Sequence, residues 1–321
     1  MTTQQNLAPL QIAVLGAGGV GGWYAGVLAL AGHEVSVLAR GAHLEAIRRD
    51  GLQLRSSEGI QVARVRASDD VRELGRPDLV VVSVKAYSLE DIAPAAVYLA
   101  AAGAAILPLL NGVDAADRLA ALGVPSGSLL GGLTVISAAR TGPGEIERRS
   151  TFQRVVMGAL GGAHGSTEDW AARLGVFAQA FASAEVEATI SPRIEVDLWN
   201  KLAFLASMAA ACGLARADVG AVRSAPNGAL LIERAVTETV SVAEAMGIHL
   251  GSDAVTRTVA AIGALPASMR PSLLLDLERG GQTEIDVLSG AISRLGHAHG
   301  VATPIHDTAW TAISAVADKA Q

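Results

Sequence analysis

Three glycines near the N-terminus have the spacing that a dinucleotide-binding loop requires. Gly16, Gly18 and Gly21 form a G-x-G-x-x-G pattern between an apolar run at 12–15 and an Ala/Leu-rich, helix-forming segment at 23–31. The first glycine permits a tight strand-to-helix turn, the second lets backbone N–H groups approach a pyrophosphate, and the third lets the helix pack close to the strand. Because 35 of the 321 residues are glycine, the strand-to-helix context carries this prediction more than the spacing does.

The end of the second predicted strand indicates which dinucleotide binds. Residues 34–38 lead into Ala39 and Arg40, with no acidic residue at the carboxyl end of the strand. An NAD-binding unit usually places an acid there for the ribose 2′-OH, whereas an arginine nearby accommodates the 2′-phosphate of NADP. The pattern therefore favours NADP(H), the alternative being that Arg40 is an ordinary exposed arginine.

Two further polar residues follow apolar strands of the same predicted sheet. VVVSVK ends at Lys85, and ILPLL is followed by Asn111. Ligands of open α/β sheets bind beyond the carboxyl ends of the strands. Lys85 and Asn111 are therefore candidate ligand contacts, and the alternative for each is a strand-end side chain that only reaches water.

Composition limits the classes of protein that remain. Half of the chain is hydrophobic, which excludes disorder, and its length suits two domains. The first ten residues lack the features of a signal peptide, and the longest apolar run, 202–215, is interrupted by Ser207 and Gly213. The single cysteine, Cys212, cannot form an internal disulfide and is expected to be a small core residue. We therefore expect a cytoplasmic protein outside the membrane.

Charge and histidine spacing argue against two other kinds of site. The net charge of −6 disfavours a nucleic-acid surface, because phosphate contacts need clustered Lys and Arg. The seven histidines show no H-x-x-x-H or Cys/His pairing, and His297 and His299 are expected on a solvated helix end. We predict no metal site and no nucleic-acid partner. A homodimer is compatible with the sequence, which does not determine the oligomeric state.

Strand-like and helical segments alternate from residue 11 to about 190, as in a parallel sheet with crossover helices. The expected strands are 12–15, 35–38, 79–84, 105–110, 130–137, 155–158 and 186–190. After Pro192 the period becomes helical, with expected helices at 193–212, 228–246, 253–262 and 285–298, the last preceded by a capping-box-like Thr283-x-x-Asp286. We therefore predict an α/β Rossmann-like domain over 1–190 and an all-α domain over 191–321.

Several short motifs occur in a characteristic order along nearly the whole chain. They are GAGGVGG at 16–22, GHEVSVLAR at 32–40, VKAY at 84–87, NGV at 111–113, WNKLAF at 199–204, and S-x-x-x-D-x-E at 272–278 leading to TEID at 283–286. In this order and spacing the sequence resembles the ketopantoate reductase family, the NADPH-dependent 2-dehydropantoate 2-reductases.

The resemblance implies a Rossmann domain joined to a helical domain like the C-terminal one of 6-phosphogluconate dehydrogenase, with a small 2-oxo acid bound in the cleft between them. It also implies a role in pantothenate biosynthesis. By matching motif, Arg40 would hold the NADP 2′-phosphate, and Lys85 and Asn111 would border the nicotinamide and the substrate. Glu284 would lie against the cofactor as well.

The resemblance also implies that Lys201 is the general acid, with Ser272 and Glu284 binding substrate and orienting their neighbours. Reduction of a ketone needs a proton for the developing alkoxide, and a desolvated lysine can donate one near neutral pH. Lys201 lies in an apolar helical segment, where an unpaired ammonium is costly and snorkelling to the rim is the alternative. Glu284 is expected in the first turn of a helix, where the dipole favours its ionised form.

The chain departs from the family pattern where asparagines usually line the substrate pocket. Without gaps, the three positions are Leu205, Ala209 and Val219, and Asn227 matches the third only after an eight-residue insertion. An apolar pocket discriminates weakly, whereas a pocket that hydrogen-bonds a hydroxyl rejects analogues lacking it. We therefore expect a substrate pocket more apolar than that of a ketopantoate reductase, with ketopantoate a poor substrate compared with a 2-oxo acid of more apolar side chain; a related ketone or an imine is the alternative.

A non-enzymatic NADP(H)-binding sensor is a different class of function that the glycine-rich loop alone would permit. A sensor has no need of a buried acid, however, and the chain retains Lys201, Ser272 and Glu284. These three residues therefore favour a reductase.

Overall fold

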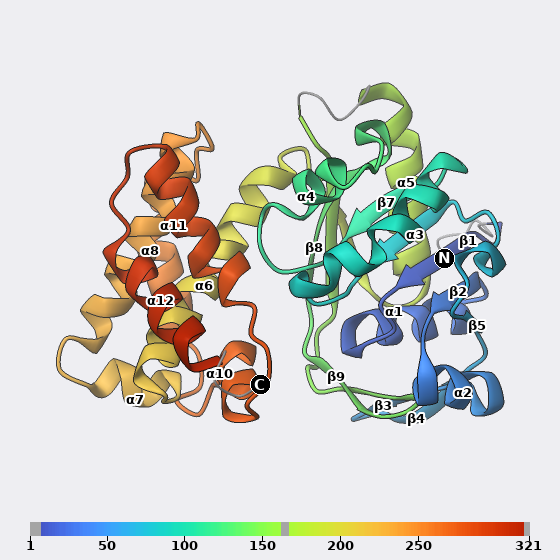
Figure 1. The fold of residues 1–321 in the computed structure, drawn as a ribbon, viewed down its shortest axis with the longest axis horizontal. Coiled ribbons are helices and arrows are strands. Elements are labelled where there is room, and N and C mark those ends of the chain that lie inside the picture. The colour runs from blue at the N-terminus through green and yellow to red at the C-terminus, as the bar shows by residue number, and fades with distance from the viewer. Residues whose placement is uncertain (1–7, 162–166, 318–321) are drawn as a thin grey trace, which may run out of the picture. The chain divides into compact units, whose positions relative to one another are not determined.

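The computed structural model describes residues 8–161 and 167–317, which divide into two units (Figure 1). The first unit contains the described residues up to Leu110 together with Ala115–Ile194. The second contains Asn111–Asp114 and the residues from Glu195 onward. The sequence predicted a boundary between residues 190 and 191, but residues 191–194 group with the first unit. The short segment Asn111–Asp114, predicted in the first domain, groups with the second unit.

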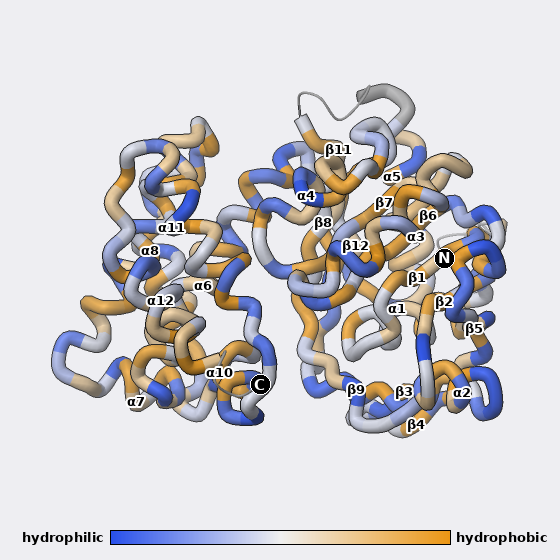
Figure 2. The backbone as a smooth tube through the Cα atoms, viewed as in Figure 1, coloured by the Kyte–Doolittle hydropathy of each residue, from blue (hydrophilic) through white to orange (hydrophobic). Residues whose placement is uncertain are grey.

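A parallel sheet was predicted for the first unit, and the observed one has five strands, of which the three-residue edge strand Arg66–Ser68 was not predicted. Its strand order is β5-β2-β1-β6-β7, with β1 Gln11–Leu15, β2 Glu34–Leu38, β5 Arg66–Ser68, β6 Leu79–Val82 and β7 Ala105–Pro108. β6 and β7 are buried throughout, and Figure 2 colours them hydrophobic, which is typical of parallel strands covered on both faces. From β1 the chain adds β2 and β5 on one side, and it then adds β6 and β7 on the other side of β1. Ligands of open parallel sheets bind at such a change in strand order, here between β1 and β6.

Helices connect these strands. They are α1 Gly19–Leu30, α2 Gly41–Asp50, α3 Leu89–Ala101, α4 Ala115–Ala121 and α5 Thr167–Ser183, with 3₁₀ turns η1 Val71–Leu74, η2 Ala86–Ser88 and η3 Ser126–Ser128. α1 contacts β1 and β2 of this sheet and also a second sheet, formed by β3 Leu52–Ser56, β4 Gly59–Ala63, β9 Ala138–Gly142 and β10 Glu145–Arg148. This position explains why seven of its twelve residues are buried.

Two smaller sheets complete the first unit and depart from the purely parallel pattern expected. One has the order β4-β3-β10-β9, from β3 Leu52–Ser56, β4 Gly59–Ala63, β9 Ala138–Gly142 and β10 Glu145–Arg148. The other has the order β12-β11-β8, from β8 Leu130–Val135, β11 Arg154–Ala159 and β12 Glu187–Ile190. β8 and β11 correspond to predicted strands, but they pair antiparallel, and the four strands of the first sheet were not predicted.

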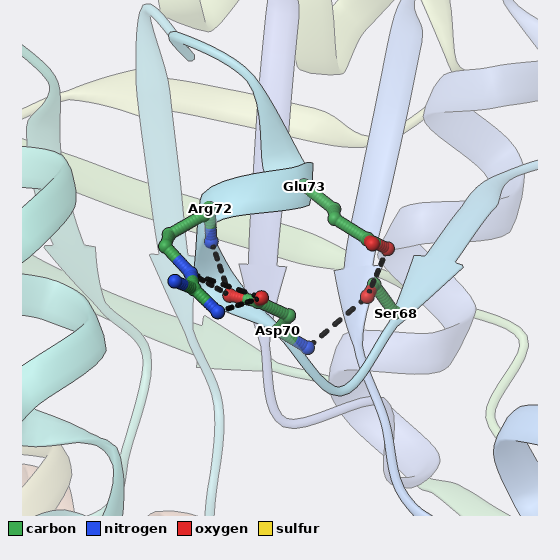
Figure 3. Close-up of polar contacts among 4 residues, drawn as sticks. All are labelled: Ser68, Asp70, Arg72 and Glu73. Carbon is green, nitrogen blue, oxygen red and sulfur yellow. Dashed lines mark hydrogen bonds and ion pairs between the residues drawn. The ribbon is translucent and has the colours of Figure 1, made fainter.

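Local polar contacts hold the turn after β5, which is the edge strand beside β2 (Figure 3). The Asp70 carboxylate accepts the Arg72 backbone N–H at 2.9 Å and so caps η1, while the Ser68 hydroxyl donates to Glu73 at 2.6 Å. The exposed Arg72–Asp70 ion pair adds little, because solvent screens it. The backbone carbonyl of Ser68 also accepts the backbone N–H of Ala39 at 2.9 Å, so this turn supports the chain that leads into Arg40.

The second unit is helical, as predicted, and its described residues contain no β-strand. The helices are α6 Ile194–Ala215, α7 Val219–Ser224, α8 Gly228–Ala245, α9 Ala254–Gly263, α10 Ser272–Glu278, α11 Ser289–Ala298 and α12 Pro304–Ala317. The helix expected at 285–298 is divided into the 3₁₀ turn η5, Ile285–Val287, and α11. The capping box is wrong: η5 has no side-chain cap, and Asp286 instead accepts from Arg294 at 2.7 Å.

The long helix α6 forms the core of this unit. By length and composition it would pass as a membrane span, but 61% of its most apolar 18-residue window is buried inside the protein, as in the core helix of a globular domain. Cys212 lies on α6 with 1% exposure, and burial raises the pKa of its thiol to about 11. This confirms the expectation of a core cysteine, since burial disfavours the reactive thiolate.

A buried histidine joins α12 to α8 and α11. The His306 Nε2–H donates to the Ala235 carbonyl at 3.0 Å, so its Nδ1 accepts from the Ser289 hydroxyl at 3.1 Å. The Glu238 carboxylate accepts the backbone N–H of His306 at 3.1 Å. Burial lowers the pKa of His306 from 6.5 to about 4, because the imidazolium would lose its hydration.

This lowered pKa predicts acid lability of the helical unit. The unfolded chain binds a proton at His306 below pH 6.5 and the folded chain only near pH 4, so stability is complete above 6.5 and falls across that window, by up to about 3 kcal/mol. Thermal unfolding measured from pH 7.5 to 4 should show His306→Gln with a lower Tm at pH 7.5 but a flatter decline than wild type. The exposed His299→Gln serves as the control, and equal slopes in all three proteins would contradict the assignment.

Candidate active site

The glycine-rich loop lies between β1 and α1, and each glycine of the pattern meets a different steric demand. Gly16 has φ +102°, and a Cβ there would lie 2.7 Å from Val84 Cγ1. A Cβ at Gly21 would overlap the Ser83 hydroxyl and the Gly16 carbonyl. At Gly18, the N-cap of α1, a Cβ would meet nothing within 4 Å. The loop therefore offers open space at the start of a helix, which fits the pyrophosphate of a dinucleotide.

His43 fixes the shape of this loop and was not singled out from the sequence. Its Nε2–H donates to the Ala17 carbonyl at 2.7 Å, and its Nδ1 accepts the Gly144 backbone N–H at 2.9 Å. The side chain is buried, and burial lowers its pKa, so the neutral ring that this bonding requires is favoured. The sequence feature that could have indicated a structural role for His43 is its position beside Leu44 and Ile47, on the buried face of α2.

The first unit also positions Arg40 and Lys85 at the carboxyl ends of strands. Arg40 is exposed at the N-cap of α2, two residues beyond the end of β2. Within residues 8–161 and 167–317 its guanidinium has no hydrogen-bond or ion-pair partner. Lys85 is partly buried at the N-cap of η2, three residues beyond β6.

Three predicted residues come together in the second unit. The Asn111 amide donates to the Glu284 Oε2 at 3.2 Å, and Glu284 is 7% exposed. Lys201 lies on α6, where burial lowers the pKa of its ammonium from 10.5 to about 8, while the Glu284 carboxylate acts in the opposite direction. Residues from three distant parts of the chain thus form a lysine, carboxylate and amide group.

This group has the chemistry of a proton donor that works near neutral pH. A lysine with a pKa of about 8 is largely protonated at pH 7 yet releases its proton far more readily than an exposed lysine. The placement of Glu284 differs from expectation. Glu284 precedes the turn η5 and does not lie in the first turn of an α-helix, so its support is Asn111 and not a helix dipole. Ser272 is exposed at the first residue of α10, with no side-chain hydrogen bond to a described residue.

The positions that depart from the family pattern also lie in this unit. Leu205 and Ala209 follow Lys201 by four and eight residues on α6, so the three share one helix face. Leu205 is partly buried, whereas Ala209 and Val219 are 2% and 0% exposed, within apolar clusters. An asparagine restored at 209 would therefore enter a hydrophobic cluster, so Leu205 is the position best suited to substitution.

Comparison with known proteins places this chain. Residues 12–162 match the family model described as ketopantoate reductase PanE/ApbA, and residues 193–317 match its C-terminal counterpart. A 2-dehydropantoate 2-reductase of Halobacterium salinarum is 35% identical over 302 residues, covering 92% of this chain and 95% of that protein.

Solved structures agree with the family match. A PanE/ApbA family ketopantoate reductase from Ralstonia eutropha superposes with a TM-score of 0.84 at 29% identity, covering 97% of this chain and 99% of the other. A D-mandelate dehydrogenase in a ternary structure with NADH and anilino(oxo)acetate gives 0.86 at 25% identity, covering 96% and 99%.

A glycine-rich strand-to-helix loop in one unit, and a lysine of lowered pKa near a carboxylate in the other, fit an oxidoreductase that interconverts CH–OH and C=O groups with a nicotinamide cofactor. Matches over most of the length of the chain then narrow that class. The protein belongs to the ketopantoate reductase family.

Burial and the Glu284 charge act in opposite directions on the pKa of Lys201, and this predicts how the catalytic rate depends on pH. Glu284→Gln removes the charge that raises the pKa of Lys201, so the alkaline limb of the kcat profile for ketone reduction should move to lower pH. The measurement is kcat from pH 6 to 10 with saturating substrates. Asp286→Asn, an exposed acid two residues away that pairs with Arg294, is the matched control and should leave the limb in place. A limb that stays put in Glu284→Gln, or moves upward, would contradict the coupling.

Proposed function

We propose that this protein is an NADPH-dependent reductase of a 2-oxo acid, with a substrate-binding region more apolar than a ketopantoate-specific enzyme needs. The observation that carries the proposal is the Lys201 ammonium, whose pKa is lowered to about 8 beside the buried Glu284, in a chain of the ketopantoate reductase family. The family of biosynthetic reductases also supports a cytoplasmic location and a place in pantothenate biosynthesis for a member that accepts ketopantoate.

The protein's own residues supply binding and the proton. Gly16, Gly18 and Gly21 receive the pyrophosphate, and a bound nicotinamide supplies the hydride. Lys201 donates a proton to the substrate carbonyl oxygen, where negative charge develops. The Glu284 charge keeps the lysine protonated against the cost of burial, and the Asn111 amide holds that carboxylate in place.

The remaining residues orient the reactants in this proposal. Lys85 and Asn111 border the nicotinamide and the substrate, and Glu284 lies against both. Ser272 offers an exposed hydroxyl at the start of α10 as a substrate ligand. Arg40 takes the 2′-phosphate, since it is exposed at the N-cap of α2 beyond a strand that ends without an acid.

The apolar character of the substrate side chain rests on Leu205 and Ala209. Both share a helix face with Lys201 and provide no hydrogen-bonding group. The D-mandelate dehydrogenase among the structural neighbours gives independent support, because mandelate is a 2-hydroxy acid that carries a phenyl group. We propose a 2-oxo acid with a hydrophobic branched or aromatic side chain as the preferred substrate.

A panel of 2-oxo acids tests this function directly. We expect steady NADPH oxidation with several members, and a higher kcat/KM for those with apolar side chains than for ketopantoate. Lys201→Ala should lower kcat about 10²- to 10⁴-fold, the usual contribution of a positioned general acid. Its NADPH affinity should be unchanged, because the glycine loop and Arg40 lie in the other unit.

Two controls make that panel decisive. Lys201→Ala must keep the thermal transition of the wild type, and Leu205→Asn should raise activity on ketopantoate relative to the apolar substrates. Ketopantoate as the best substrate of the unmodified protein would refute the apolar preference. A folded Lys201→Ala that retains most of its kcat would remove Lys201 from the mechanism.

Cofactor choice has its own test at Arg40. Charge-assisted hydrogen bonds contribute about 1.5–3 kcal/mol, so Arg40→Ala should weaken NADPH binding about 10- to 150-fold and leave NADH nearly unchanged. Fluorescence titration of the protein with each cofactor measures both constants. Arg49→Ala, an exposed arginine near the far end of the same helix, is the matched control. Equal loss of both cofactors in Arg40→Ala would refute the role.

A further inference from the structure

Strand β9 runs from the start of the dinucleotide helix to the neighbouring helix α2. At its beginning, a Cβ on Gly19 would overlap the Ala138 carbonyl and lie 2.8 Å from the Ala139 Cα. Beyond its end, in the turn to β10, Gly144 donates its backbone N–H to His43 on α2 at 2.9 Å. β9 therefore borders the glycine-rich loop on the side where α2 begins.

Arg140 lies on β9 between these two contacts. It pairs across the sheet with Ile146 of β10, and a Cβ on Gly22 of α1 would lie 2.7 Å from Ile146 Cδ1. Because directly paired residues of neighbouring strands project to the same face, Arg140 lies on the face of the sheet that packs against α1.

The electrostatics of the neighbouring histidine agree with this position. The pKa of His43 is lowered first by burial and further by the positive charge of Arg140, while its bond to the Ala17 carbonyl acts in the opposite direction. Arg140 is therefore close to the residue that holds the glycine loop, and His43 itself lies three positions after Arg40.

Neither guanidinium is neutralised by the protein. Arg40 and Arg140 are both exposed, and within residues 8–161 and 167–317 neither has a hydrogen bond or ion pair to a carboxylate. The two acids of α2 are paired with other arginines of that helix: Glu45 with Arg48, and Asp50 with Arg49. Two unpaired cations from separate elements at one loop are suited to a ligand with two negative charges.

We propose that Arg140 is a second phosphate-binding cation of this protein, which acts with Arg40 on the 2′-phosphate of NADP(H). The inference rests on the proposed NADPH preference and adds a determinant from the other side of the loop. A phosphate monoester accepts from two guanidinium groups through separate oxygens, so each arginine contributes to affinity. A ribose 2′-hydroxyl is uncharged, so a ligand without the phosphate forms no ion pair with either arginine.

Adenosine 2′,5′-bisphosphate and 5′-AMP are the probes, because they differ only in the 2′-phosphate and lack the nicotinamide. Calorimetric titration compares wild type with Arg140→Ala, Arg140→Lys, Arg40→Ala and the double alanine variant. Arg55→Ala is the matched control: Arg55 is exposed on β3 of the same sheet, next to Leu54, whose side chain faces α1, so Arg55 projects from the opposite face.

We expect Arg140→Ala to weaken the bisphosphate about 10-fold or more and 5′-AMP less than about twofold. Arg140→Lys should retain part of the affinity, and Arg55→Ala should change neither ligand. Far-UV circular dichroism and the thermal transition verify folding, and Arg140→Lys, which keeps the charge, provides a second folded variant.

The outcomes separate the two proposals. If wild type binds the bisphosphate no more tightly than 5′-AMP, the NADPH preference itself is wrong. If wild type prefers the bisphosphate and Arg40→Ala loses that preference while Arg140→Ala behaves like Arg55→Ala, only the assignment of Arg140 is overturned. Equal weakening of both ligands by Arg140→Ala would also overturn it, because Arg140 would then support the loop and not the phosphate.

Discussion

The burial of the Lys201 ammonium group constrains the structure of the helical unit. Burial lowers the pKa of the Lys201 ammonium to about 8, and the charge of Glu284 opposes that shift. The Glu284 side chain is itself buried, at 7% exposure, and a buried carboxylate needs hydrogen-bond donors such as the Asn111 amide. α6, the turn η5 and the segment Asn111–Asp114 are thus constrained by a single electrostatic balance.

In the first unit, close packing around the glycine-rich loop and α1 is the main constraint. α1 lies between two sheets, and two of its early residues have no room for a side chain: a Cβ at Gly21 would overlap the Ser83 hydroxyl just after β6, and a Cβ at Gly22 would lie 2.7 Å from Ile146 Cδ1 of the smaller sheet. The crowding leaves Gly18 as the position that opens to a ligand. The hydrogen bond from His43 to the Ala17 carbonyl then fixes the conformation of the loop without a ligand.

The parallel sheet and the helical second unit were predictable because their signals are local: buried β-type runs with glycine punctuation, then sustained helical periodicity. β4 and β9 were missed because they lack a buried apolar run: four of the five residues of β4 are exposed, and no residue of β9 is fully buried. The β3–β10 pairing that joins the two hairpins spans almost a hundred residues of sequence. The motifs marked Lys201, Asn111 and Glu284, but their meeting depends on tertiary packing, and η5 replaced the expected helical turn. His43 escaped notice because its bonds reach two distant backbone groups.

The grouping of Asn111–Asp114 with the helical unit means that the chain passes between the units three times, after Leu110, Asp114 and Ile194. The helical unit is therefore not a contiguous module. A fragment that begins near residue 190 would carry Lys201 and Glu284 but not the amide that bonds Glu284. Recombination between relatives at that junction would separate Glu284 from its hydrogen-bond donor, so the helical unit is exchanged intact only together with the four residues Asn111–Asp114.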